Sequence, residues 1–156
     1  MAKEIERKFL LRDDSWRKEV SSSGEYRQGY LPMRDDGTTV RIRIAEGRGI
    51  LTIKGPTAGV TRSEFEYGIP IVDATALLDQ LCARPFIQKT RHIVIVDGHR
   101  FEVDEFCGYN EGLIVAEIEL PSEDAPFPRP PWLGREVSDD PRYFNANLAK
   151  RPYNTW

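Results

Sequence analysis

Glu4-Ile5-Glu6-Arg7-Lys8 is the stretch of sequence that decides the fold, because Glu4, Glu6 and Lys8 place a charged side chain at every second position. Successive side chains of a β-strand point to opposite faces, so Glu4, Glu6 and Lys8 share one face and Ile5 lies on the other. Like charges on one face repel, and Thr or Ser would serve an ordinary solvated face equally well. The stretch therefore predicts a strand whose charged face meets groups of opposite charge.

The same alternation with period two continues along most of the chain, which indicates a mainly β (α+β) fold. Two dipeptides, Asp36-Gly37 and Asp97-Gly98, are typical of β-hairpin turns and favour antiparallel pairing. Eight strands are enough for a barrel or a sandwich. The predicted strands are residues 4–10, 25–31, 39–44, 49–54, 62–70, 87–96, 99–106 and 113–120.

The composition indicates one ordinary globular domain over residues 1–156. The chain has 22 Lys and Arg against 25 Asp and Glu, a net charge of −3, and 40% hydrophobic residues. No apolar run reaches the roughly 20 residues of a membrane span, and the charged start lacks the features of a secretory signal, so we expect a cytoplasmic protein without a membrane partner. Without a Lys/Arg-rich block, nucleic acid is not the expected partner. Cys82 and Cys107 have neither disulfide-framework nor zinc-site spacing.

Helices are predicted to be few and short, flanking the sheet. One is expected near Trp16, a second from Ala74 to Leu81 with Asp73 as its cap, and a third after Asp139-Asp140-Pro141. Five prolines between residues 121 and 131 exclude a helix or a central strand there and predict a surface loop.

The charged faces of the predicted strands allow two arrangements. In the first, an antiparallel sheet turns its apolar side inward and its charged side to water. In the second, the strands close and the charged faces line a lumen, which must be hydrated and filled by counter-charges because isolated buried charges are costly. A polyanion and divalent metal ions would satisfy both sets of charge. The lumen would hold the cations Lys8, Arg41, Arg43, Lys54, Lys89 and Arg91 and the anions Glu4, Glu6, Glu64, Glu66, Glu102, Asp104, Glu117 and Glu119.

These residues resemble the successive motifs of the CYTH superfamily, also called triphosphate tunnel metalloenzymes. The N-terminal stretch matches the ExExK motif of that family, and the short chain resembles its single-domain bacterial-type members. The resemblance implies an eight-stranded antiparallel closed β-barrel, or tunnel, with a few flanking helices. The other matching segments are Gln28-Gly29-Tyr30-Leu31, Val40-Arg41-Ile42-Arg43, Leu51-Thr52-Ile53-Lys54-Gly55, Glu64-Phe65-Glu66, Lys89-Thr90-Arg91, Glu102-Val103-Asp104 and Ala116-Glu117-Ile118-Glu119-Leu120.

The resemblance also implies roles for the charged residues. Among the acids, Glu102 has the least support for a role in the site, because a salt bridge at the edge of the barrel would explain its presence equally well. Lys89 is expected either to activate the attacking water or to clamp phosphate, and Glu6 is expected to take part in catalysis through the metal. The triphosphate would be held by Lys8, Arg41, Arg43, Lys54, Lys89 and Arg91, and Mg²⁺ or Mn²⁺ by Glu4, Glu6, Glu117 and Glu119, with Asp104, Glu64 and Glu66 assisting a second metal or a water network.

The expected function is metal-dependent hydrolysis of the terminal phosphoanhydride of inorganic tripolyphosphate, a small-molecule substrate. One alternative is a class IV-type adenylyl cyclase or a thiamine or nucleoside triphosphatase, for which Trp132, Phe127 and Tyr30 are candidate linings of a base pocket. Another is a non-catalytic polyphosphate- or nucleotide-binding protein, which the retained carboxylates disfavour. A homodimer is expected by family analogy.

Overall fold

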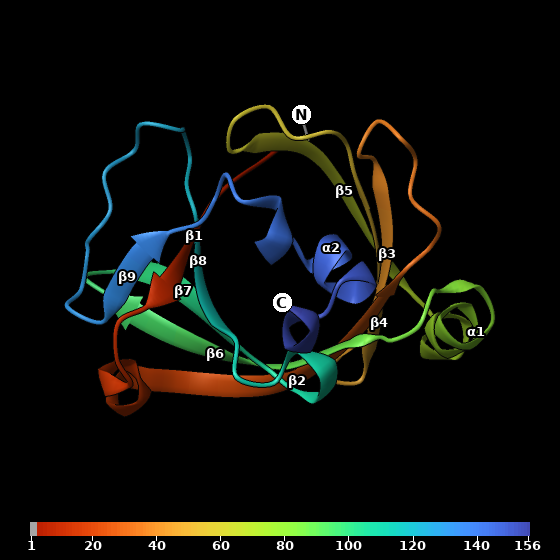
Figure 1. Cartoon of the computed structure of the whole chain (residues 1–156), viewed down its shortest axis with the longest axis horizontal. Helices are drawn as coiled ribbons and strands as arrows, with labels where there is room; N and C mark the ends of the chain where they lie inside the picture. The colour runs from red at the N-terminus through yellow and green to blue at the C-terminus, as the bar shows by residue number, and fades with distance from the viewer. Residues whose placement is uncertain (1–2) are drawn as a thin grey trace.

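The computed structural model describes residues 3–156 and contains a closed, eight-stranded antiparallel barrel (Figure 1). The neighbours around it are β1, β5, β4, β3, β2, β6, β7, β8 and again β1. This arrangement confirms the predicted fold class. The strands of the barrel are β1 (Lys3–Leu11), β2 (Val20–Tyr30), β3 (Thr39–Ala45), β4 (Arg48–Lys54), β5 (Thr61–Ile69), β6 (Ile87–Val96), β7 (His99–Phe106) and β8 (Ile114–Glu119).

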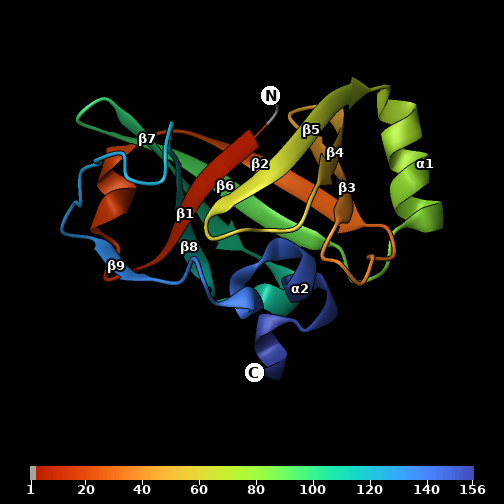
Figure 2. The same cartoon turned by 90° about the horizontal axis from the view of Figure 1, so that it is seen from above.

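Strand β1 closes the barrel because its two halves pair with different neighbours. Its first residues pair with β5, so that Glu4 lies opposite Arg62, and its later residues pair with β8, so that Glu6 lies opposite Glu119. Every backbone edge of the eight strands therefore finds a partner along at least part of its length. The two views in Figures 1 and 2 show β1 running obliquely between β5 and β8.

Two strands differ from the sequence prediction by more than one residue at an end. A ninth strand, β9 (Leu133–Glu136), pairs with the later part of β1 and was not predicted. It has only four residues, too few to show an alternation, and it depends on the edge of β1 opposite to β8, which is free beyond the pairing with β5. Strand β2 begins at Val20 rather than at residue 25, because its Ser-rich first half pairs with β6.

The turns confirm one predicted hairpin and correct the other. Asp97 and Gly98 both have positive φ, +48° and +77°, as the tight turn between β6 and β7 requires. Asp36 and Gly37 instead lie within the longer connection 31–38 between β2 and β3. The tight turn in this region is formed by Glu46 and Gly47 between β3 and β4.

The helices are few and short, as expected. Helix α1 (Ile71–Leu81) begins three residues before the predicted start, because the Pro70 carbonyl accepts the Ala74 N–H and opens the first turn. Residues near Trp16 form a 3₁₀ turn, and the third predicted helix is divided into the turn Pro141–Tyr143 and helix α2 (Asn145–Lys150). In the described residues 3–156, no helix has the length and apolarity needed to span a membrane.

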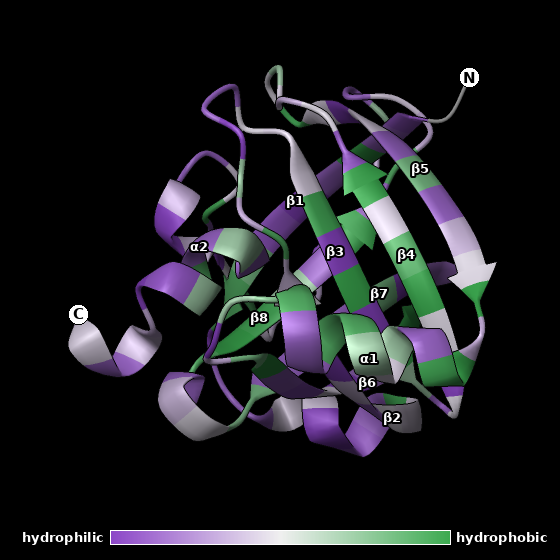
Figure 3. Cartoon of the chain, turned by 90° about the vertical axis from the view of Figure 1, so that its right-hand side faces the viewer, coloured by the Kyte–Doolittle hydropathy of each residue, from purple (hydrophilic) through white to green (hydrophobic). Residues whose placement is uncertain are grey.

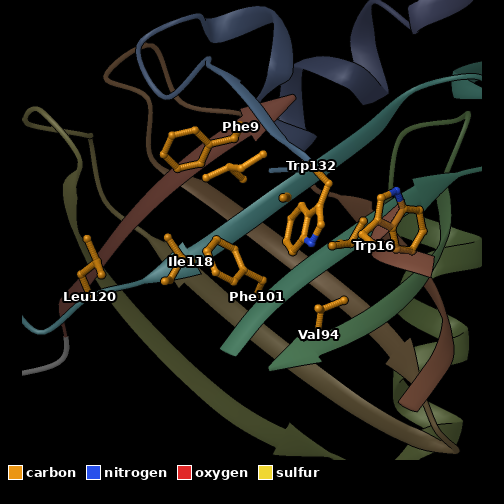
Figure 4. Close-up of a cluster of buried hydrophobic side chains, with 10 residues drawn as sticks. Phe9, Trp16, Val94, Phe101, Ile118, Leu120 and Trp132 are labelled. Atoms are coloured by element: carbon orange, nitrogen blue, oxygen red, sulfur yellow. The ribbon is translucent and has the colours of Figure 1, made fainter. Parts of the chain in front are cut away.

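The apolar residues lie mostly outside the barrel wall. The largest cluster, around Phe9, Phe101 and Trp132, packs on the outer faces of β1, β6, β7 and β8, where part of the proline-rich loop 121–131 covers it (Figure 4). Helix α1 packs Ala74 and Leu78 on the outer face of β3. Figure 3 shows α1 beside β4 and the alternation of polar and apolar residues along β3.

One end of the barrel has an apolar lining closed by the C-terminal segment. Tyr30, Ile87, Phe106 and Val115 pack there against a group that includes Leu148 of α2. In Figure 2, α2 lies beneath β8 and β6, far from α1. Most of the remaining inward positions carry polar and charged side chains, Ile50 of β4 being an exception, and the charged faces of the strands are therefore turned inward.

Candidate active site

The barrel encloses a charged cavity of about 760 Å³. Nine Lys or Arg residues and eight Asp or Glu residues are among those that line it. The cavity lining is therefore nearly neutral in total, and each of its charged side chains needs a neighbouring charge of opposite sign, from another side chain or from a bound ion. The predicted site residues that line it are Lys8, Arg41, Arg43, Lys54, Lys89 and Arg91 among the cations and Glu4, Glu6, Glu64, Glu66, Glu102, Glu117 and Glu119 among the acids.

Most of the cations lie on one side of the barrel, which we call the basic wall: Arg41, Arg43, Lys54, Lys89 and Arg91 on β3, β4 and β6. Arg41, Arg43 and Arg91 are buried. The Arg41 Nη2 donates to Thr52 Oγ1 at 3.0 Å, whereas its buried Nε makes no hydrogen bond within residues 3–156. A buried donor of this kind suits an anion such as a phosphate oxygen.

Arg43 and Lys54 have contrasting partners. The Arg43 Nε donates to the fully buried Gln28 Oε1 at 2.8 Å, and burial lowers the pKa of Arg43 to about 10, with the cations Arg41 and Arg91 adding to the effect. The Lys54 Nζ lies 2.6 Å from Glu4 Oε2 and 3.3 Å from Glu64 Oε2. Lys54 thus forms ion pairs with two glutamates, while Arg43 has no such partner in the described part of the chain.

Lys89 and Arg91 both make their shortest ion pairs with Asp104, and Arg91 also lies 3.4 Å from Glu102 Oε2 and 3.9 Å from Glu117 Oε2. The Lys89 Nζ donates to Asp104 Oδ2 at 2.6 Å, and the Arg91 Nε and Nη2 donate to Asp104 Oδ1 and Oδ2, both at 2.8 Å. These contacts hold the pKa of Asp104 below its ordinary value despite complete burial, with Arg91 the largest lowering cause. Burial lowers the pKa of Lys89, and the neighbouring Arg91 and Arg43 add to this effect.

Asp104 differs in position from the other predicted acids. Its carboxylate is fully buried, is not among the residues lining the cavity, and has both oxygens hydrogen-bonded to Lys89 or Arg91. A metal ligand in the cavity needs an oxygen that faces it. Asp104 therefore acts in this structure as the counter-ion behind the basic wall.

The opposite side of the cavity, the acidic wall, consists of Glu4, Glu6, Glu117 and Glu119 on β1 and β8. Lys8 lies directly opposite Glu117 in register, with its Nζ 3.7 Å from Glu117 Oε1. The pKa of each of these four glutamates is raised, mainly by burial. Neighbouring carboxylates contribute, since Glu4 raises the pKa of Glu6 and Glu6 raises that of Glu117.

This donor set fits a hard divalent cation, although no closed ligand cage is present. Carboxylate oxygens are the ligands that Mg²⁺ and Mn²⁺ prefer. Burial is the main cause of the raised pKa values of Glu6 and Glu117, and neighbouring carboxylates add to it, so a cation bound here would favour the ionised glutamates. Among residues 3–156, no group of three or more His, Cys, Asp and Glu side chains is already arranged as a metal site. Mg²⁺ commonly retains several water ligands and binds one or two carboxylates together with substrate phosphates, so a cage is not required.

The structure also adds residues that the sequence did not single out. Gln28 orients Arg43, Thr52 accepts from Arg41, and Asn145 lies 3.4 Å from the Lys89 Nζ. Tyr26 and Lys150 line the cavity as well. Their residue types are common in packed strands and on helix surfaces, so only their neighbours reveal these positions.

The candidate base pocket is corrected in two of its three residues. Trp132 is buried against Phe101 and donates its indole N–H to Glu19 Oε2 at 2.8 Å, and Phe127 packs against Phe9. Both lie in the outer core cluster, so neither can contact a molecule inside the barrel. Tyr30 does line the cavity, with its hydroxyl accepting from the Gln28 side-chain amide.

Comparisons with known proteins agree with this geometry. The family model described as the CYTH domain matches residues 2–153. A protein from Acetivibrio thermocellus named inorganic triphosphatase is 47% identical over 156 residues, which cover 100% of this chain and 99% of that protein. Another from Nitrosomonas europaea with the same name is 36% identical and covers 94% of this chain and 96% of its own.

A solved structure described as an inorganic triphosphatase has the same fold. It superposes with a TM-score of 0.65 at 35% identity, covering 93% of this chain and 96% of the other. A protein from Pyrococcus horikoshii shares the fold at 16% identity, with a TM-score of 0.60 and coverage of 78% of this chain and 81% of the other. The family match along nearly the whole chain, the relatives of similar length and the charged barrel lead to one conclusion: this chain belongs to the CYTH domain family.

Proposed function

We propose that this protein is a divalent-metal-dependent triphosphatase that hydrolyses the terminal phosphoanhydride bond of inorganic tripolyphosphate. The observation that carries the proposal is the pairing of a basic wall and an acidic wall across one closed cavity. The basic wall suits a chain of phosphates, and the acidic wall suits the metal that bridges it. Relatives of similar length, 47% and 36% identical, are named inorganic triphosphatases, which supports the same substrate here.

In this proposal the phosphate oxygens are bound by Lys8, Arg41, Arg43, Lys54, Lys89 and Arg91. Phosphoryl transfer depends chiefly on positioning and on charge stabilisation, and these cations provide both without a covalent intermediate. Asp104 fixes the direction of Lys89 and Arg91 from behind. Arg41 offers its unused Nε, and Gln28 holds Arg43 by one nitrogen so that the terminal nitrogens remain for phosphate.

Mg²⁺ or Mn²⁺ would be held by Glu4, Glu6, Glu117 and Glu119, with Glu64 and Glu66 at the edge of the site. The bound ion would neutralise phosphate oxygens and polarise the phosphorus for attack. Because Glu4 is also the partner of Lys54, the acidic wall is joined to the basic wall at this point. Glu6 is the best single residue for testing the acidic wall, since it lies between Glu4 and Lys8 on the inward face of β1.

Lys89 is proposed to act on the attacking water. In the reaction, the water oxygen forms a bond to the terminal phosphorus in line with the bond that breaks, the water proton passes to Lys89, and pyrophosphate leaves. The lowered pKa of Lys89 favours the neutral amine that must accept this proton. As a protonated side chain, the same residue would clamp phosphate instead, because its ammonium carries three donors and makes two hydrogen bonds within residues 3–156, to Asp104 and Asn145.

The experiment compares phosphate and pyrophosphate release from tripolyphosphate, ATP and thiamine triphosphate, each with Mg²⁺ or Mn²⁺. Wild type is compared with Glu6→Gln and with Glu105→Gln, a change of a carboxylate on the outer face of β7. Metal-dependent phosphate release from tripolyphosphate that is lost only in Glu6→Gln is the expected result. Pyrophosphate release from ATP alone would favour the cyclase, and silence on all three substrates would contradict the proposal.

A further inference from the structure

Tyr26 places an aromatic ring against two cations of the basic wall. It lies on the inward face of β2, opposite Ala45 of β3 and Lys89 of β6 in register, and it lines the cavity. The Cζ of Arg43 is 4.8 Å from the centre of its ring, and the Cζ of Arg91 is 5.0 Å from the same centre. One side chain thus contacts guanidinium groups that come from two different strands.

These two guanidinium groups repel each other and differ in how they are held. Both are buried, and each lowers the pKa of a neighbouring cation: Arg91 lowers that of Arg43, and both lower that of Lys89. Arg91 is fixed by Asp104 and lies 3.4 Å from Glu102. Arg43 has no carboxylate within ion-pair distance in residues 3–156, and within these residues its guanidinium is held by the Gln28 amide and the Tyr26 ring.

A π face is suited to this position because it attracts a cation without neutralising it. A carboxylate beside Arg43 would compete with phosphate for its donors, whereas a ring leaves the terminal N–H groups available. The contact is strengthened by burial, since cation–π attraction grows as the cation loses water. The hydroxyl of Tyr26 forms no hydrogen bond with any described residue, so the ring is the part of the side chain that acts.

We propose that Tyr26 is a positioning residue that holds Arg43 and Arg91 side by side with their terminal nitrogens directed to the phosphate chain. This inference rests on the proposed function, in that the two arginines must bind the substrate. Tyr26 itself need not touch the reacting atoms. Its effect passes through Arg43 and Arg91, and an aromatic ring of similar size should therefore replace it.

The first test compares Tyr26→Leu with Tyr26→Phe on tripolyphosphate. We expect Tyr26→Leu to lower kcat/KM by about tenfold, the loss that corresponds to removing two partly desolvated cation–π contacts, with most of the change in KM. Tyr26→Phe should restore kcat/KM to near the wild-type value. Tyr67→Leu is the matched control, because Tyr67 is an exposed tyrosine on β5 that does not line the cavity. Equal activity of Tyr26→Leu and wild type would overturn the inference.

A double-mutant cycle separates positioning from general damage to the barrel. If Tyr26 acts through its cations, Tyr26→Leu should cost much less in the Arg43→Gln background than in wild type. Full additivity of the two changes would overturn the inference. Melting curves of all variants provide the comparison for loss of folding.

A binding measurement keeps this test separate from that of the proposed function. The dissociation constant of tripolyphosphate is measured by calorimetry with EDTA present, so that neither turnover nor metal contributes. Weaker binding by Tyr26→Leu with rescue by Tyr26→Phe supports the positioning role even if no hydrolysis occurs. Unaltered binding by Tyr26→Leu contradicts that role even if wild type is an active triphosphatase.

Discussion

Replacement of Asp104 by Asn tests whether the basic wall depends on a buried counter-ion. Asn has nearly the same shape but carries no charge, so Lys89 and Arg91 would lose the carboxylate that both contact at 2.6 to 2.8 Å. Breaking a fully buried ion pair by removing one partner costs about 3–5 kcal/mol in the free energy of unfolding, because the remaining charge loses its compensation. Arg91 would keep only its longer contacts, 3.4 Å to Glu102 and 3.9 Å to Glu117. Asp104 is 0% exposed, so solvent screening should not reduce this cost.

The expected change is large enough for a thermal melt. For a chain of this size, 1 kcal/mol corresponds to roughly 2–4 °C, so Asp104→Asn should lower Tm by about 6–20 °C. Because Lys89 and Arg91 would lose their orientation as well, kcat/KM for tripolyphosphate should fall by about 100-fold, a typical effect of misplacing catalytic groups. Both quantities can be measured on one preparation of metal-loaded protein.

Glu105→Gln is the matched control for Asp104→Asn. Glu105 is the next residue on β7 but points outward, where Arg17 Nη2 lies 2.8 Å from Glu105 Oε2 in a half-exposed pair. Exposed pairs contribute about 0–1 kcal/mol, so this variant should melt within a few degrees of wild type and retain activity. The reasoning is refuted if Asp104→Asn melts no lower than Glu105→Gln, since burial would then not make the counter-ion necessary.

Three further predictions concern the acidic wall and the entrance of the cavity. Glu6→Gln should raise the Tm of the metal-free protein, because it removes an ionised carboxylate whose pKa is raised by burial and by Glu4. The same change should lower the rate of hydrolysis with Mg²⁺ by at least about 100-fold. A lower Tm would contradict the placement of Glu6 in the acidic wall. In the metal-free protein, the pKa values of Glu6 and Glu117 are raised, so these residues stabilise the fold increasingly as the pH falls through their pKa values towards the ordinary glutamate pKa of about 4.3. The rise in Tm on adding Mg²⁺ should therefore be larger at pH 8, where both carboxylates are ionised, than at pH 5.5. Scanning fluorimetry at the two pH values measures this difference. Lys150→Ala should raise KM for tripolyphosphate by no more than a fewfold, because this exposed lysine lines the cavity at its edge and its charge is screened; a loss of about 100-fold in a steady-state assay would place it in the phosphate clamp instead.

The strands were most predictable where the sequence itself marks their ends. Strands β6 and β7 have the predicted bounds, since Asp97-Gly98 adopts the positive φ values of a tight turn between them. Strand β9 has no such mark, because a four-residue segment after a proline-rich loop is stabilised by its partner β1 and not by its own pattern. The early start of β2 likewise depends on pairing with β6.

The candidate site was predictable in its residue types but not in its contacts. Period two places Asp104 and Tyr26 on the inward face, yet it does not distinguish a side chain that reaches the cavity from one covered by its neighbours. Asp104 is covered by Lys89 and Arg91, and this results from the lengths of those side chains across β6 and β7. Tyr26 has the residue type of ordinary strand packing, so only the guanidinium groups of Arg43 and Arg91 against its ring distinguish it.

The two faces of the barrel wall have opposite effects on stability, and this explains why the apolar faces are turned outward. Raised pKa values in the acidic wall show that the ionised glutamates destabilise the metal-free fold. The outer clusters around Phe101 and Leu78 offset that cost by burying apolar surface under the proline-rich loop and α1. Because the stabilising contacts lie outside the wall, the lumen is free to carry charge, and a bound metal and polyanion add to stability where the apoprotein is weakest.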